Sequence, residues 1–182
     1  MYVISDVERL DCLSLDSYLR YLPKDRREKA SQFRRDIDRK NCVISYWLLQ
    51  YGLYKDYGIR SFSLLYDRNN KPYLSDYPHI HFSISHCDLG CICAIADNPV
   101  GVDIQDIRPF SWPVVKHCCS VGEIQLLKNS DDPANEFTKI WTIKESFLKM
   151  KGTGILCDLR TVDTIKFQEK VKTFGSKLEP KK

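Results

Sequence analysis

Residues 136–152 read EFTKIWTIKESFLKMKG, and their apolar spacing predicts an amphipathic helix over about 134–151. Trp141, Glu145 and Lys149 recur every four residues, so they share one face of that helix. A Glu four residues before a Lys often forms an ordinary surface ion pair. Trp141 on the same face indicates instead that the face is partly covered. A partly buried carboxylate and ammonium need partners such as a metal ion or a phosphate.

Upstream, residues 100–105 read VGVDIQ and are predicted to form a strand. Alternate residues of a strand share a face, so Gly101, Asp103 and Gln105 would lie together, opposite the apolar residues. The glycine would let a ligand approach the backbone while the carboxylate and amide oxygens ligate a hard cation. The alternative is a strand whose outer face is merely polar.

Residues 81–86 read HFSISH, within a strand predicted over 79–85. Ser83 and Ser85 would share one face, and His86 would stand at the strand end as part of a phosphate cradle. A lone His is more often a structural hydrogen-bonding residue, so for this segment alone the structural and the functional interpretation have equal weight. The segment also lacks the nucleophile elbow of a serine hydrolase. Together the three segments indicate a divalent cation, cationic groups for phosphates, and a carboxylate near a lysine. This set suits phosphoryl-type transfer from a phosphorylated cofactor.

Periodicity in the rest of the chain predicts alternating strands and helices. The expected strands cover residues 1–4, 61–66, 91–96 and 161–167, and the expected helices cover 15–22, 24–57 with a break near 34–38, and 113–129. Residues 67–70 are predicted to form a turn. The similar order of elements in both halves predicts an α+β protein with two related lobes.

Composition indicates an ordinary globular protein of one domain or two half-domains, with 182 residues, 43% hydrophobic and 29% charged. The apolar runs are shorter than a membrane span, and the N-terminus has no basic and apolar leader pattern. We therefore expect a cytoplasmic protein without a membrane partner. Eight cysteines without a C-x-x-C pair are predicted to be buried free thiols rather than metal ligands or disulfides.

Basic side chains gather in residues 24–40, which hold eight basic and four acidic residues, and in 166–182, which hold six lysines and two acids. A local net charge of +4 on each segment favours a phosphate site. One alternative is a solvated helix face with internal ion pairs. The other is a nucleic-acid-binding module, against which the interleaved acids count, so no nucleic-acid partner is expected.

Four motifs together resemble the Sfp-type 4′-phosphopantetheinyl transferases, over about residues 1–167. They are KPYL at 71–74, FSISH at 82–86, VGVDI at 100–104 and, most specific, WTIKESFLK at 141–149. The resemblance implies an α+β fold of two pseudosymmetric lobes, each a small antiparallel sheet packed on helices, with the active site between them. Residues 1–98 would form the lobe on the side of the coenzyme A 3′-phosphate. Residues 99–182 would form the lobe with the metal and the catalytic helix.

The implied activity is Mg²⁺-dependent transfer of 4′-phosphopantetheine from coenzyme A to a serine of an acyl or peptidyl carrier protein. This is holo-[acyl-carrier-protein] synthase activity, and it releases adenosine 3′,5′-bisphosphate. By resemblance, Asp103, Gln105 and Glu145 would ligate Mg²⁺, Glu145 would also be the general base, and Lys149 would steady the transferred phosphate. Glu123 matches an acid close to the catalytic helix. The implied coenzyme A contacts are Arg26, Lys29, Lys71, Ser85 and His86.

Three positions depart from the family pattern. Gln105 stands where the family often has Glu, and Asn70 replaces a glycine but tolerates the same left-handed conformation. The chain ends at Lys182, whereas the family continues through further strands. We therefore expect a short second sheet with an open edge after 161–167, and either a monomer or a dimer paired through that edge. A catalytically inactive coenzyme A- or nucleotide-binding relative is the alternative reading, although Asp103, Glu145 and Lys149 are intact.

Overall fold

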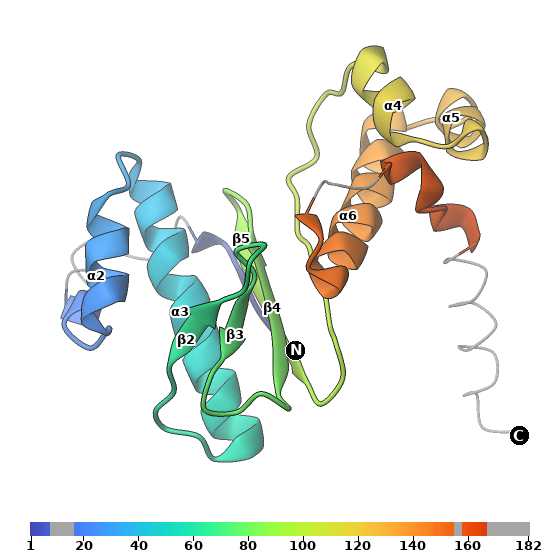
Figure 1. Cartoon of the computed structure of the whole chain (residues 1–182). Coiled ribbons are helices and arrows are strands. Elements are labelled where there is room, and N and C mark those ends of the chain that lie inside the picture. The colour runs from blue at the N-terminus through green and yellow to red at the C-terminus, as the bar shows by residue number, and fades with distance from the viewer. Residues whose placement is uncertain (8–16, 155–157, 167–182) are drawn as a thin grey trace, which may run out of the picture. The chain divides into compact units, whose positions relative to one another are not determined.

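The computed structural model describes residues 1–7, 17–154 and 158–166. Its contacts divide the chain into two compact units. The first unit contains residues 1–106 and 145–154, and the second contains residues 107–144 and the described part of 155–182. Figure 1 shows the mixture of helices and small antiparallel sheets that the sequence predicted.

The first unit is built on a three-stranded antiparallel sheet in the order β1–β5–β4 (Figure 1). Its strands are β1 (Tyr2–Ser5), β4 (His81–His86) and β5 (Gly90–Ala96). The central strand is the apolar one, with Cys91 opposite Ile4 of β1 and Cys93 opposite Ile84 of β4. A second, two-stranded sheet pairs β2 (Leu64–Tyr66) with β3 (Pro72–Leu74) around the predicted turn.

Helix α3 (Asp36–Tyr57) covers the three-stranded sheet and contributes Ile44, Leu48, Leu49 and Leu53 to the core of the unit. Leu49 and Leu53 are fully buried and belong to one cluster with Phe82 of β4. The helix ends at Gly58, whose φ of 69° is the left-handed conformation typical of a helix C-terminus. Helix α2 (Lys24–Ser31) precedes it, so the predicted break in the long helix is confirmed, at residues 32–35.

The described part of the second unit is helical. It contains α4 (Trp112–Cys118), α5 (Val121–Lys128), the first part of α6 (Pro133–Lys151) and the 3₁₀ helix η3 (Leu159–Thr161). Ser120 and Glu123 form a reciprocal capping box that starts α5.

The strand predicted over 161–167 is wrong within its described residues. Residues 159–161 form η3 and residues 164–166 a helical turn, while 167 lies outside the described residues. The Asp158 side chain accepts from the Arg160 backbone N–H at 3.0 Å, and that of Glu123 accepts from the Thr164 N–H at 2.9 Å. These side chains satisfy donors that a strand ladder would need. The expected second sheet, and the open edge through which a dimer would pair, are therefore absent from residues 107–144 and 158–166.

The strand predicted over 100–105 is also wrong, because these residues belong to no sheet of the described chain. A Cβ at Gly101 would collide with the backbone of Ser146 and Met150, so the segment lies directly on helix α6. The Val102 N–H donates to the Ser83 hydroxyl at 3.1 Å instead of to a strand carbonyl. Segments 99–106 and 145–154, expected in the second lobe, thus pack within the first unit. The pseudosymmetry of the two lobes stays a prediction.

The described cysteines are free thiols, and five of the six are buried, as predicted. Cys91 and Cys93 lie in the core of the first unit, where they pack as small apolar residues. Among the described helices, none combines the length and the apolar character that a membrane crossing needs.

Candidate functional site

Asp103 lies at the centre of a polar contact network in the first unit. Its side chain is completely buried, and its Oδ1 accepts from the Ser85 hydroxyl at 2.7 Å and from Lys149 Nζ at 2.5 Å. Lys149 Nζ also donates to Ser85 Oγ at 2.7 Å. Strand β4, the 99–106 segment and helix α6 each contribute one of these three residues. Because a buried negative charge is unfavourable unless it is paired, the Lys149 ammonium group serves as the counter-ion of Asp103.

Gln105 contacts the other oxygen of the same carboxylate. Its Nε2 donates to Asp103 Oδ2 at 3.0 Å, while the residue itself is exposed. The amide therefore acts here as a hydrogen-bond donor to Asp103. It would have to present its oxygen in order to ligate a cation.

Glu145 lies one helical turn before Lys149, and one of its carboxylate oxygens is buried without a hydrogen bond from the described residues. Within the described residues, its Oε1 has no hydrogen-bond partner. Burial raises the pKa of Glu145, the negative charge of Asp103 raises it further, and Lys149 opposes both. An unpaired buried oxygen beside a second carboxylate is a favourable place for a cation.

This pair of carboxylates fits Mg²⁺, which takes one or two protein carboxylates and completes its shell with waters and substrate phosphates. No group of three or more His, Cys, Asp or Glu side chains that could hold a metal occurs in the described part of the chain. The residues thus fit a metal that shares its ligands with a phosphorylated substrate, and they do not form an all-protein cage.

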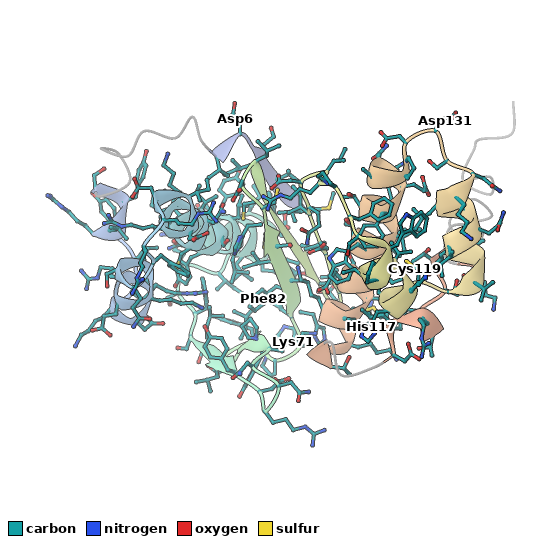
Figure 2. The ribbon with its side chains drawn as sticks, turned by 90° about the horizontal axis from the view of Figure 1, so that it is seen from above. Asp6, Lys71, Phe82, His117, Cys119 and Asp131 are labelled. Carbon is teal, nitrogen blue, oxygen red and sulfur yellow. The ribbon has the colours of Figure 1, made fainter. Side chains whose placement is uncertain are left out.

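A pocket of about 280 Å³ in the first unit brings these groups next to an apolar wall. Glu145 and Lys149 line it together with Phe82, Ile84 and Lys71. Figure 2 shows Phe82 on its strand with Lys71 close by. The pocket can therefore hold a ligand that has both a charged and an apolar part.

Lys71 is engaged at the end of helix α6. Its Nζ donates to the backbone carbonyl of Met150 at 2.8 Å. Loss of solvation lowers the pKa of Lys71, and the charge of Asp67 only partly offsets this. The structure thus places Lys71 in the pocket wall, where its ammonium group also caps a helix.

His86 connects this site electrostatically with helix α2. Loss of solvation lowers the pKa of His86. The charge of Lys149 lowers it further, Asp38 partly opposes this, and Lys29 adds a smaller lowering, although the residue keeps an exposed surface. Arg26 lies on the same helix as Lys29, with its guanidinium 5.2 Å from the centroid of the Tyr46 ring. Lys149 of the polar network and Lys29 of α2 are therefore both close enough to His86 to influence its charge.

The second unit contains a buried ion pair that the sequence analysis did not foresee. Lys144 Nζ lies 2.8 Å from Glu123 Oε2, and these side chains are 1% and 0% exposed. Lys144 also donates to the carbonyls of Leu159 and Val162, at 2.8 and 2.6 Å. Glu123 is therefore close to α6, as expected, and it anchors the helix just before Glu145. The sequence signal was the position of Lys144, four residues from the buried Ile140 and four from the buried Leu148.

The sequence of the chain is similar to those of one family of known proteins. The model of the 4′-phosphopantetheinyl transferase superfamily matches residues 99–181. The chain is 28% identical over 144 residues to the 4′-phosphopantetheinyl transferase Sfp of Bacillus subtilis (strain 168), which covers 77% of this chain and 64% of that protein. It is 31% identical over 136 residues to the 4′-phosphopantetheinyl transferase gsp of Aneurinibacillus migulanus, covering 71% and 56%.

A yeast protein is also similar. The L-aminoadipate-semialdehyde dehydrogenase-phosphopantetheinyl transferase of Saccharomyces cerevisiae is 25% identical over 166 residues, which cover 84% of this chain and 61% of that protein. The chain thus spans 56% to 64% of the length of these three curated relatives. Residues 99–181 of the chain thus match the 4′-phosphopantetheinyl transferase superfamily, and most of the chain is similar in sequence to transferases of this kind.

Proposed function

We propose that the protein catalyses Mg²⁺-dependent transfer of 4′-phosphopantetheine from coenzyme A to a serine hydroxyl of an apo acyl or peptidyl carrier protein. Similarity to the 4′-phosphopantetheinyl transferase superfamily supports this activity. The observation that carries the proposal is the unpartnered, buried oxygen of Glu145 beside the Asp103–Ser85–Lys149 network. This arrangement leaves one carboxylate available both to a cation and to a proton.

In this proposal, the first unit binds coenzyme A through its cationic groups. Arg26 and Lys29 contact the 3′-phosphate, and the ligand continues past His86 towards the pocket. Lys71 and Ser85 contribute at the pocket itself. Their charges and donors offset a ligand that carries several negative charges, and hydrogen bonds between ionised groups are the stronger ones.

The bound Mg²⁺, held by Asp103 and Glu145 with Gln105 directly or through a water, would offset the charge of the pyrophosphate. The carrier serine oxygen forms a bond to the phosphorus that carries pantetheine. The bond from that phosphorus to the bridging oxygen breaks, and adenosine 3′,5′-bisphosphate leaves with the electron pair. Glu145 accepts the serine proton as the general base. Lys149 donates to the phosphate oxygens on which charge develops.

Intact-mass spectrometry tests this directly. The protein is incubated with coenzyme A, Mg²⁺ and a panel of apo carriers from fatty-acid, polyketide and peptide synthesis. We expect one carrier or more to gain one phosphopantetheinyl group, and Glu145→Gln to nearly abolish the gain. Binding of coenzyme A without transfer to any carrier would support the inactive relative instead. Absence of binding would refute both functions.

A further inference from the structure

The turn between β2 and β3 is organised by one carboxylate. Asp67 Oδ1 accepts the backbone N–H groups of Asn69 and Lys71, at 2.8 and 2.9 Å. The Asn70 N–H donates to the Asp67 carbonyl at 3.0 Å, and Asn70 takes the left-handed φ of 60°. An Asp side chain that bonds the backbone two residues on is a known way to define a turn. Asp67 therefore sets the conformation of residues 67–71.

The same turn holds the C-terminal end of helix α6. The Asn69 side-chain amide donates to the Gly152 carbonyl at 2.8 Å, and Lys71 Nζ donates to the Met150 carbonyl at 2.8 Å. The last carbonyls of a helix lack partners within the helix, so these two side chains satisfy them. Gly152 has a φ of 69°, and a Cβ there would lie 2.8 Å from Lys71 Cδ, which explains the glycine.

This contact forms part of the pocket that contains the candidate catalytic groups. Asn69, Lys71 and Gly152 line the same 280 Å³ pocket as Glu145 and Lys149. Glu145 precedes Gly152 by seven residues, about 10 Å along a helix. A displacement of the helix end would therefore be transmitted to Glu145 through less than two helical turns.

We propose that Asp67 and Asn69 are positioning residues. They fix the end of α6 to the 67–71 turn, an attachment called the clamp below, and so hold Glu145 in its place in the pocket lining. This inference rests on the proposed function for its catalytic consequence. The side-chain amide of Asn69 donates to the Gly152 carbonyl, so Asn69 would act on Glu145 through the helix. Asp67 acts one step further away, through the conformation of the turn.

Hydrogen exchange of the ligand-free protein tests the clamp independently of activity. In Asn69→Ala, the amides of the last turn of α6 should exchange about fivefold faster, the effect of losing one hydrogen bond of about 1 kcal/mol. Arg68→Ala is the matched control, because Arg68 lies exposed in the same turn. Its exchange should match the wild type. Wild-type exchange in Asn69→Ala would overturn the clamp.

Steady-state transfer kinetics test the positioning role. We expect Asn69→Ala to lower kcat about fivefold, with a change in the KM for coenzyme A of less than about twofold, because the clamp positions Glu145. Asp67→Ala should reproduce the faster exchange and the lower kcat. Asp67→Asn should partly restore them, since its amide oxygen can still accept the two N–H groups. Faster exchange with wild-type kcat would overturn the positioning role. Faster exchange in a protein that transfers to no carrier would retain the clamp and refute the proposed function.

Discussion

Replacing Lys149 by Met tests whether the lysine is the counter-ion of Asp103 in the metal-free protein. Met keeps an unbranched side chain of similar length but removes the charge. Asp103 would lose the ammonium contact at 2.5 Å and keep the Ser85 and Gln105 donors at 2.7 and 3.0 Å. We therefore expect a folded but less stable protein.

The size of the effect follows from burial. Removing one partner of a buried ion pair costs about 3–5 kcal/mol. The Asp103 side chain is 0% exposed, but that of Lys149 is 31% exposed and two donors remain. The expected loss in the free energy of unfolding is therefore smaller, about 2–3 kcal/mol. For a chain of this size, this corresponds to a fall in Tm of roughly 4–12 °C.

The same substitution should strengthen metal binding, because the ammonium group competes with a cation for Asp103. We expect the Kd for Mn²⁺, used alone without coenzyme A, to fall about tenfold, which corresponds to about 1.4 kcal/mol. Electron paramagnetic resonance of free Mn²⁺ measures this affinity, and calorimetry with and without Mg²⁺ measures recovery of the Tm.

Lys151→Met is the matched control, because Lys151 is exposed and its Nζ lies over the Phe147 ring at 5.5 Å. It removes the same charge two residues further along. Equal effects in both variants would indicate a general charge effect. A Lys149→Met protein with the wild-type Tm and Mn²⁺ affinity would refute the reasoning.

Three further substitutions probe the other ionisable groups. Glu145→Gln should raise the Tm measured without metal. Because the pKa of Glu145 is raised in the folded protein, wild-type stability falls as pH rises from the pKa of the unfolded chain to that of the folded protein. Calorimetry across this pH range should show no such fall in the variant. Identical pH profiles would contradict this. Glu123→Gln should cost about 3–5 kcal/mol in denaturant unfolding at neutral pH, since it removes the counter-ion of the buried Lys144 ammonium group. Burial opposes the charged form of Glu123, but its hydrogen bonds lower its pKa overall. The stability that Glu123 contributes is therefore present above its pKa in the unfolded chain and is lost as pH falls through its pKa in the folded protein. If Glu123→Gln lowered the free energy of unfolding by the same amount in acid as at neutral pH, this assignment would be contradicted. Gln105→Glu should lower the Tm measured without metal, because it replaces a hydrogen-bond donor to Asp103 by a second carboxylate. The same variant should need less Mg²⁺ for half-maximal transfer. An unchanged or higher Mg²⁺ requirement would place Gln105 outside the metal site.

Helices and paired strands were predictable because their patterns are local. The apolar spacing of residues 24–57 and 134–151 predicted helices, and α2, α3 and α6 occupy these ranges. Alternation predicted β4 and β5, which pair as neighbours in sequence. In both cases the residues that form the buried face lie within the element itself or in the adjoining one.

Alternation alone did not determine whether a strand would find a partner. Residues 100–105 and 161–167 have strand-like patterns, yet the first belongs to no sheet and the second is helical where it is described. Gly101 lies on helix α6 at Ser146, 45 positions further along the chain. The side chain of Glu123, about 40 positions upstream, takes up the Thr164 N–H. Contacts at such separations leave no periodic signal in the segment that they reshape.

The composition of the site followed from sequence motifs, but its electrostatics did not. The motifs placed Asp103, Glu145 and Lys149 in one predicted site, and the structure brings these three residues together in the first unit. Only the tertiary structure decided that Lys149 neutralises Asp103 and that Lys144, from the same helix, is buried against Glu123. Helical periodicity determines which residues share a face. The charge that compensates each residue depends on distances to segments up to 46 positions away, because the energy of an ion pair is set by separation and burial.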